Sequence, residues 1–403
     1  MDFEPWWLIF VPLLFALGWI AARVDVRQMV SETRNLPDSY FKGLNFLLNE
    51  EPDRAIDAFV EVAKLDPETT ELHFALGSLF RRRGEMERAI RVHQSLLARA
   101  DLPQVDRENA QHELAQDFLK AGMLDRAEDA FDAIQSARFA VPAVRALIHI
   151  YESEHDWPRA IEAVKRLRAL VDEPVPQLVH YQCERAQAAL DKSDLPAAEA
   201  ALDEADNALR LLRGQGGSQA SEARVAILKA ALARLQGTPG KELAHLESVL
   251  TIAPEFGGLV AAELLACHRR EGSEEQGLAT LREYYQHYPS LDVFKVVFEG
   301  LRARRGYDPA WEFARAALRA HPSLLGLDRL LEAELASGDS SGKAGIAPGA
   351  DLGLLRTLIH KHIQRLDRYS CRVCGFEARH FYWQCPGCNS WETYEPRRIE
   401  ELK

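Results

Sequence analysis

The chain has 403 residues, which is enough for two or more domains or for one long repeat array. Its apolar fraction of 47% is ordinary for a folded protein and argues against disorder throughout the chain. The formal net charge is −12, and an acidic chain of this kind disfavours nucleic acid as its main partner.

An apolar segment opens the chain. From Pro5 to Ala22, eighteen residues carry no charge, and as a helix they would span about 27 Å, enough to cross the hydrocarbon core of a bilayer. Acidic residues precede this segment, and arginines follow it from Arg23 onward. That order disfavours a cleaved signal peptide, which is the main alternative, and places the chain after about residue 23 in the cytoplasm. We therefore predict a single-pass transmembrane anchor at residues 1–22 and a juxtamembrane linker at 23–35.

A helix-turn-helix unit recurs about every 34 residues between residues 36 and 335, which is the period of tetratricopeptide repeats (TPRs). The clearest copies align Gly43, Phe46 and Ala55 with Gly77, Phe80 and Ala89. Small residues let the paired helices approach closely, and the aromatic residues fill the space between turns. We predict about eight units, the last four degenerate, stacked into a superhelix with a long concave groove.

Turn signals divide each predicted unit into its two helices. They are Gly84-Glu85, Gly122-Met123, His155-Asp156, Ser193-Asp194, Gly237-Thr238, Gly272-Ser273 and Gly306-Tyr307. The sequence contains no Gly-rich phosphate loop, nucleophile elbow or His-Glu-x-x-His motif, so we predict no enzyme, no catalytic residue and no cofactor-binding residue. The run from Arg81 to Arg83 is interpreted as a solvated helix end, and scattered histidines such as His93 as residues on helix faces.

Behind the repeats, residues 336–350 are rich in Gly, Ser and Ala and predict a flexible linker. Apolar residues at helical spacing then predict a connecting helix at residues 351–368. They are Leu352, Leu355, Leu358, Ile359, Ile363 and Leu366. A short tail at residues 396–403 closes the sequence.

Four cysteines near the C-terminus, Cys371, Cys374, Cys385 and Cys388, form two Cys-x-x-Cys pairs. Each pair closes a tight knuckle, and four thiolates at this spacing bind one tetrahedral Zn²⁺ or iron ion, with the choice of metal left open. Four protein ligands leave no coordination position for substrate, which indicates a structural metal. A segment this short buries too little apolar surface to fold alone, so the ion supplies the free energy of its folding.

Aromatic residues surround the four cysteines in sequence. They are Phe376, Phe381, Tyr382, Trp383 and Trp391. We predict that they form a small core around the metal, and a face that docks on the rest of the protein is the alternative. His360 and His362 lie close to the first knuckle, but four thiolates already suffice, so no metal role is predicted for them.

The order of these parts resembles the lipopolysaccharide assembly protein B (LapB/YciM) family of Gram-negative bacteria. The resemblance covers essentially the whole chain, and it is most specific where the sequence reads Cys-Arg-Val-Cys-Gly-Phe and then Tyr-Trp-Gln-Cys-Pro-Gly-Cys-Asn-Ser-Trp. It implies an all-α TPR superhelix with an N-terminal transmembrane helix and a small rubredoxin-like or zinc-ribbon domain at about residues 369–395. The metal ligands of the family correspond to Cys371, Cys374, Cys385 and Cys388. The spacer between the cysteine pairs is shorter than in true rubredoxins, which counts against electron transfer.

The resemblance further implies a non-enzymatic scaffold of the cell inner membrane that regulates lipopolysaccharide synthesis. Its implied partners are inner-membrane lipid, the membrane protease FtsH, the lipid A pathway deacetylase LpxC and a regulator of the LapC/YejM type. In this interpretation the scaffold promotes proteolysis of LpxC by FtsH. Two alternatives stay open: an iron-tetrathiolate redox sensor or electron carrier, and a zinc-ribbon nucleic-acid binder suggested by arginines near the knuckles. Whether the chain forms a homodimer is also left open.

Overall fold

The computed structural model describes residues 19, 38–49, 51–65, 69–171, 174–212, 218–336 and 351–402. The predicted anchor and juxtamembrane linker, apart from Trp19, and nearly all of the predicted linker before residue 351 lie outside these residues. Among the described helices, none is both long enough and apolar enough to cross a membrane by itself. The segments Pro239–Ile252 and Pro254–Arg270 meet the same criteria of length and composition only when taken together, and a bend of 120° separates them.

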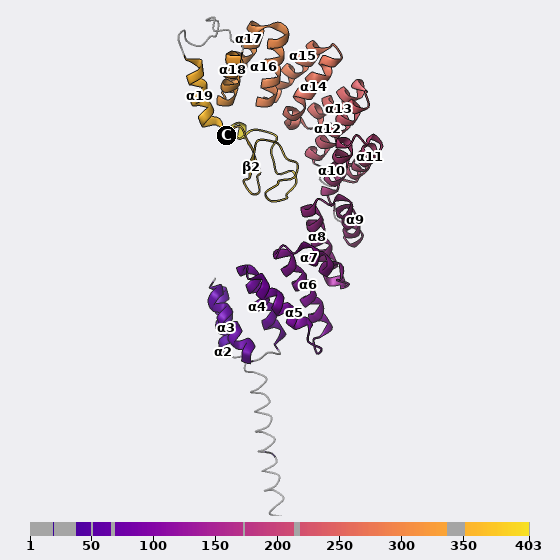
Figure 1. Cartoon of the computed structure of the whole chain (residues 1–403), viewed down its shortest axis with the longest axis vertical. Helices are drawn as coiled ribbons and strands as arrows, with labels where there is room; N and C mark the ends of the chain where they lie inside the picture. Colours follow the sequence, from indigo (N-terminus) through magenta and orange to yellow (C-terminus); the bar gives the residue numbers. More distant parts are fainter. Residues whose placement is uncertain are drawn as a thin grey trace, which may run out of the picture. The chain divides into compact units, whose positions relative to one another are not determined.

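The chain divides into two compact units, Met1–Ile150 and Tyr151–Lys403, and helix α8 (Ala137–Glu154) runs across the boundary. The first unit contains α2 (Asp38–Leu48), α3 (Pro52–Leu65), α4 (Thr70–Arg83), α5 (Met86–Leu97), α6 (Gln104–Lys120) and α7 (Leu124–Asp132). The repeats of the second unit consist of α9 (Trp157–Leu170), α10 (Gln177–Asp191), α11 (Leu195–Leu212), α12 (Gln219–Leu235), α13 (Pro239–Ile252), the 3₁₀ helix η2 (Pro254–Phe256), α14 (Gly257–Arg270), α15 (Glu274–His287), α16 (Leu291–Arg305), α17 (Tyr307–Ala320) and α18 (Leu324–Ala336). Figure 1 labels these elements along the chain.

The turns inside the helix pairs confirm the sequence prediction. A residue with positive φ stands at each of the seven predicted positions, namely Gly84, Gly122, His155, Ser193, Gly237, Gly272 and Gly306. The two helices of a repeat pack against each other, as α4 does on α5 and α10 on α11. The fold is therefore the all-α TPR superhelix that the period predicts.

One of the three arginines before Gly84 departs from the prediction of a solvated helix end. A Cβ atom at Gly43 would lie 2.6 Å from the ring of Phe59, and in the next copy Gly77 meets His93, which stands 34 positions after Phe59. His93 is fully buried, and its Nδ1 lies 2.5 Å from Asp117, to which Arg81 also donates a hydrogen bond of 2.7 Å. Arg81 is therefore a partly buried member of a polar network, whereas Arg82 and Arg83 are exposed as predicted.

After the repeats come α19 (Leu352–Ile363), the strands β1 (Tyr369–Ser370) and β2 (Glu377–Ala378), and the 3₁₀ helix η3 (Ile399–Leu402). We call residues 369–402 the knuckle domain. Its strands are antiparallel, with Tyr369 opposite Ala378. In Figure 1 the knuckle domain lies on the inner side of the curve described by α10 to α18.

Helix α19 packs against α18 and only in part follows the predicted apolar pattern. Ile363 is buried, whereas Leu355 and Leu358 are exposed. The helix ends at Ile363, whereas the predicted connecting helix extends to residue 368.

Candidate metal centre and its docking on the repeats

The four knuckle cysteines converge. Their Sγ atoms all lie within 4.8 Å of one another, with 3.6 Å between Cys374 and Cys385 and 3.8 Å between Cys371 and Cys388. Four sulfurs bound at about 2.3 Å to one tetrahedral Zn²⁺ would be separated by about 3.8 Å. All four are free cysteines rather than disulfide partners. The thiols thus fit one ion of the zinc or iron type, which would hold the two knuckles together.

The two knuckles have matching backbone geometry. The amide of Gly375 donates to the carbonyl of Cys371 at 2.9 Å, and the amide of Asn389 donates to the carbonyl of Cys385 at 2.8 Å. Gly375 and Asn389 have φ values of 74° and 56°, in the left-handed region that Gly and Asn tolerate best. Their positions directly after the cysteine pairs are what the sequence predicts for closing each loop.

The surroundings of the thiols favour negative charge on some of them. Burial alone raises the pKa of Cys371, but hydrogen bonds from Thr393 and the amides of Cys374 and Val373 outweigh it and lower the pKa to about 6. A hydrogen bond from Ser390 lowers the pKa of Cys388. A bound cation would stabilise the remaining thiolates, because metal ligands of this kind bind in the deprotonated form.

Trp391 anchors the knuckle domain on the repeats. Its ring lies flat on His180 of α10, with centroids 4.8 Å apart and planes at 10°, and it meets Trp157 and Tyr181 edge-on. Its indole Nε1 donates to Glu152 of α8 at 2.8 Å, and the hydroxyl of Tyr181 donates to the same oxygen at 2.6 Å. The repeats therefore pack against the ring of Trp391 and also accept the hydrogen bond from its indole N–H.

Glu392, the next residue, binds in a buried polar pocket. Its carboxylate accepts a hydrogen bond of 2.6 Å from Ser221 of α12 and lies 2.8 Å from Nε2 of His180. Since Arg224 donates to Nδ1 of His180 at 3.1 Å, the neutral ring carries its proton on Nε2 and donates it to Glu392. Burial lowers the pKa of His180 and opposes ionisation of Glu392, yet the hydrogen bonds from His180, Ser218 and Ser221 lower the pKa of Glu392 to about 2.

Arg224 stands between two tryptophans of the knuckle domain. Its guanidinium lies 5.5 Å from the ring centre of Trp383 and 5.6 Å from that of Trp391, close enough for cation–π attraction to both. It also donates to Glu184 at 2.5 Å, so its charge is compensated although it is only 4% exposed. The ring of Trp383 also stacks on the ring of Phe256 in η2, with centroids 5.5 Å apart.

The C-terminal end of the knuckle domain caps two repeat helices. Glu400 accepts hydrogen bonds from the amides of Leu324 and Leu325 at 2.7 and 3.0 Å, at the start of α18. Glu401 accepts one of 2.7 Å from the amide of Leu291, the first residue of α16. Helix N-termini expose unpaired amides and favour negative charge, so the two carboxylates act as caps supplied from another part of the chain.

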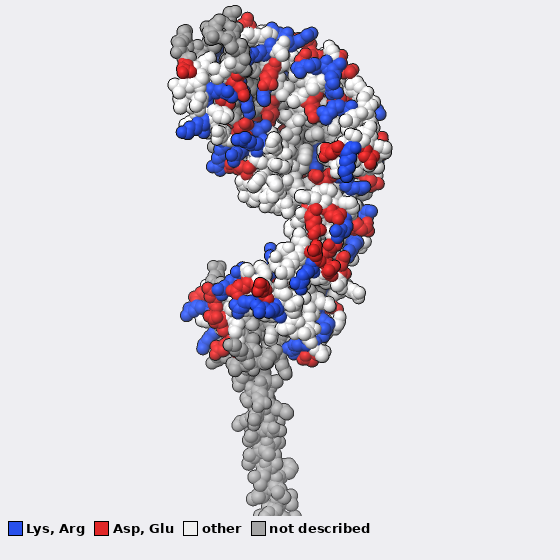
Figure 2. Space-filling view, viewed as in Figure 1, with Lys and Arg blue, Asp and Glu red and all other residues white. Residues whose placement is uncertain are grey.

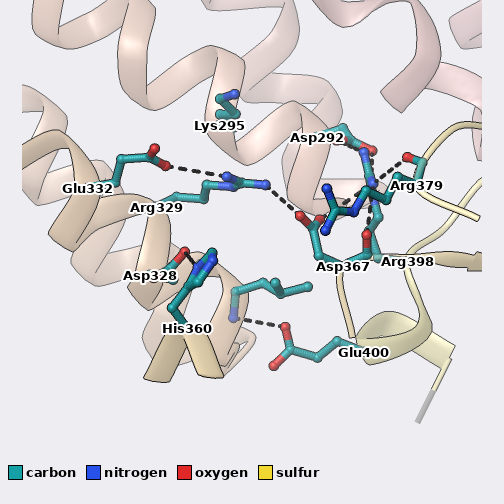
Figure 3. A network of polar contacts seen from close by, with 12 residues as sticks. Asp292, Lys295, Asp328, Arg329, Glu332, His360, Asp367, Arg379, Arg398 and Glu400 are labelled. Atoms are coloured by element: carbon teal, nitrogen blue, oxygen red, sulfur yellow. Dashed lines mark hydrogen bonds and ion pairs between the residues drawn. The ribbon is translucent and has the colours of Figure 1, made fainter. Parts of the chain in front are cut away.

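An ion-pair network joins the same end of the knuckle domain to α16 and α18, as Figure 3 shows. Arg398 pairs with Asp292 of α16 at 2.9 Å and lies over the ring of Tyr369 at 4.2 Å. Arg329 of α18 pairs at 2.9 Å with Asp367, which lies two residues before the knuckle domain and 3.5 Å from Arg398. The knuckle domain is thus held at two places on the repeats: Trp391 contacts α10, and Arg398 contacts α16.

The predicted role of the aromatic residues needs correction. Phe381 does pack in the small core with Tyr369, Cys371, Cys385 and Tyr394. Trp383 and Trp391 instead dock on the repeats, which was the alternative interpretation. Phe376 and Tyr382 are about two-fifths exposed. His360 and His362 are not part of the thiol cluster, and His360 lies 3.5 Å from Asp328.

The sequence analysis assigned no docking role to the polar residues that hold the knuckle domain, and Arg398 was considered only among the arginines that suggest nucleic-acid binding. The docking residues are Glu152, His180, Ser221, Arg224, Asp292, Glu392, Arg398, Glu400 and Glu401. The available signal was weak: a Trp-Glu dipeptide after the last knuckle and two glutamates at the C-terminus, far in sequence from their partners.

Comparison with known proteins matches both parts of the chain. Residues 369–396 match the family described as rubredoxin metal binding domain, and residues 72–107 match the tetratricopeptide repeat. Among solved structures, a tetratricopeptide repeat protein from Parabacteroides merdae is 12% identical with a TM-score of 0.25, over 73% of this chain and 98% of that chain. The C-terminal part of a TPR repeat-containing protein from Cytophaga hutchinsonii is 11% identical with a TM-score of 0.38, over 68% and 98%.

Two relatives span nearly the full chain. Lipopolysaccharide assembly protein B from Escherichia coli (strain K12) is 30% identical over 393 residues, covering 97% of both sequences. Lipopolysaccharide assembly protein B from Haemophilus influenzae is 26% identical over 404 residues, covering 98% of both. Together with the repeat fold and the four converging cysteines, these matches show that the chain belongs to the lipopolysaccharide assembly protein B family.

Proposed function

We propose that this protein regulates lipopolysaccharide synthesis as a non-enzymatic scaffold tethered to the cell inner membrane by residues 1–22. In this proposal it brings the deacetylase LpxC to the membrane protease FtsH and so promotes proteolysis of LpxC. A membrane regulator of the LapC/YejM type would restrain it. The observation that carries the proposal is full-length similarity to lipopolysaccharide assembly protein B, combined with a repeat fold that is suited to binding.

The docked knuckle domain suggests how such a scaffold recognises its partners. Its contacts run from Glu152 through Phe256 to Leu325, so one small domain ties together helices that otherwise touch only their neighbours. A repeat array is flexible because each unit contacts only adjacent units, and a bridge across several units reduces that freedom. Partners would then meet a preorganised surface that includes both repeats and knuckles.

Tethering supports the same function by mass action. A scaffold and a protease that share one membrane meet at a high effective concentration, provided that their geometry allows simultaneous contact. Deleting residues 1–22 is therefore expected to leave a folded protein that regulates poorly. Full regulation by this truncated form at native abundance would remove the anchor from the mechanism.

The central test follows the lifetime of LpxC in cells that carry the protein, a deletion, or a Trp391→Ala variant. We expect LpxC to persist longer in the deletion and in the variant, because Trp391 holds the knuckle domain on the repeats. Tyr382→Ala is the matched control, since Tyr382 is 40% exposed and its ring contacts Tyr394 within the knuckle domain. An unchanged LpxC lifetime after deletion of the whole protein would contradict the proposal.

A redox role for an iron form is the alternative, and the exposure of Cys374 gives it one favourable observation. A ligand thiol at the surface would let an electron partner approach the ion. Purified native protein that is coloured and changes its absorption reversibly with dithionite and air would support this role. A colourless protein with bound zinc and no response to dithionite would exclude it.

A further inference from the structure

Helix α19 has an apolar face that no described residue covers. Leu354, Leu355 and Leu358 are 56%, 38% and 52% exposed. Their spacing of one and four residues places them on one side of the helix. The opposite side faces α18, where Arg356 pairs with Glu332 at 3.1 Å and Ile363 is buried.

The same face becomes basic in the second half of the helix. Lys361 and His362 follow Leu358 by three and four residues, so both lie along the same ridge. Both are exposed, and Lys361 makes no ion pair with any residue in the described part of the chain. Arg365 lies two residues beyond the end of α19 and pairs with Glu377 at 2.5 Å. In Figure 2 uncharged atoms cover much of the visible upper part of α19, and blue atoms gather at its lower end.

Neither the segment before α19 nor a second copy provides a suitable cover. The segment before α19, residues 337–350, has Ile346 as its single large apolar residue. A stable contact between two copies needs about 800 Å² from each partner, far more than three partly exposed leucines supply. A bilayer surface, in contrast, needs no shaped pocket, and it accepts an apolar ridge beside cationic side chains.

We propose that α19 binds the surface of an anionic bilayer. The three leucines enter the boundary between headgroups and acyl chains, and Lys361 and His362 face the anionic headgroups. This proposal depends on the proposed tether in one respect: the tether keeps a bilayer within reach of α19. It would hold the knuckle domain, which follows α19 directly in the chain, close to the membrane.

The test uses the full chain in lipid nanodiscs of phosphatidylcholine, with or without phosphatidylglycerol, and a nitroxide label at Leu358→Cys. Cys183 and Cys267 are buried, and the knuckle thiols are protected when a metal holds them. We expect the ratio of oxygen to nickel-reagent accessibility to rise several-fold in discs that contain phosphatidylglycerol. A label at the exposed turn residue Lys192, as Lys192→Cys, is the control and should stay in water in both discs.

A second variant separates charge from apolar contact. Lys361→Glu combined with the label at residue 358 should abolish the difference between the two lipid mixtures, because it reverses the charge beside the leucines. A label at 358 that matches the Lys192 control in protein that co-purifies with the discs would overturn the α19 contact and leave the tether intact. If the chain did not co-purify with the discs, the tether would be wrong, and the same label with added phosphatidylglycerol vesicles would still decide whether α19 binds lipid.

Discussion

Trp391 of the knuckle domain lies on His180 of α10 with their ring planes 10° apart, and Glu392 hydrogen-bonds to the edge of the same histidine. One buried imidazole therefore receives two consecutive residues of the docked domain, one through its face and the other through its Nε2. A metal bound by the four thiols would fold the knuckles, and the knuckles present this dipeptide, so metal binding and docking are expected to be coupled.

Replacing Trp391 with Ala is expected to weaken docking by about 2–3 kcal/mol, since stacking, edge contacts and a buried hydrogen bond are lost together. Amide hydrogen exchange across residues 369–402 should become faster, while exchange in α4 and α5 should not change. Tyr382→Ala should leave both regions unaffected. Equal protection in the Trp391→Ala variant and the natural protein would show that the stacking contributes little.

Docking is expected to weaken in acid. The docked pKa of Glu392 is about 2 against an ordinary 4.5, so its stabilisation is complete above pH 4.5 and is lost as the pH falls towards 2. Burial lowers the pKa of His180 from an ordinary 6.5, so below that pH the released ring takes up a proton that the docked ring resists. Both pKa shifts therefore weaken docking as the pH falls. Arg224 and Ser221 hydrogen-bond to His180, and Glu184 pairs with Arg224 beside it.

This pH dependence can be followed by hydrogen exchange of the knuckle domain between about pH 7 and pH 3, with the metal content measured at each point. Glu392→Gln should remove the loss below pH 4.5 and retain the one that begins near 6.5. Unchanged docking across this range in protein that keeps its metal would contradict the role of His180.

Replacing Cys371 and Cys374 with Ser is expected to unfold the knuckle domain, because too little apolar core remains without the ion. Most of the helical circular dichroism should survive, since the repeats have their own cores. Elemental analysis should find zinc or iron in the natural protein and none in the variant. A variant with normal docking and normal control of LpxC would make the metal dispensable.

Glu400→Ala is expected to destabilise the start of α18 by about 1 kcal/mol, the usual cost of losing a helix cap. The amides of Leu324 and Leu325 should exchange faster, whereas those within α17 should be unaffected. Glu395→Ala offers a matched control, because Glu395 contacts Arg372 at 3.6 Å within the knuckle domain and caps no repeat helix. Equally slow exchange at Leu324 in both variants would rule out capping by Glu400.

Local signals made much of the fold predictable. Turn positions such as Gly84 and His155 could be read from sequence because the reversal between paired helices needs a left-handed residue, whichever partners lie nearby. The four cysteines were similarly readable because two short loops fix their spacing. In both cases the constraint lies within a few residues of the signal.

The docking could not be predicted, because its partners are distant in sequence. Glu392 and His180 are separated by 212 residues, and each looks like an ordinary surface residue in its own segment. Equally, His93 follows the repeat position of Phe59, but only the folded structure brings Asp117 against it. The apolar spacing of α19 predicted a helix, but it did not show that Ile363 is buried and Leu358 exposed.

The two capping glutamates also make the last repeats of the second unit depend on residues that follow them in the chain. Glu400 and Glu401 come after Leu291 and Leu324 in the sequence, so α16 and α18 are synthesised before their caps. A chain truncated after Tyr394 keeps every cysteine and loses both caps. Such a truncated protein would keep the four metal ligands and yet hold its final repeats loosely, which gives cellular proteases a means to distinguish it from the docked form.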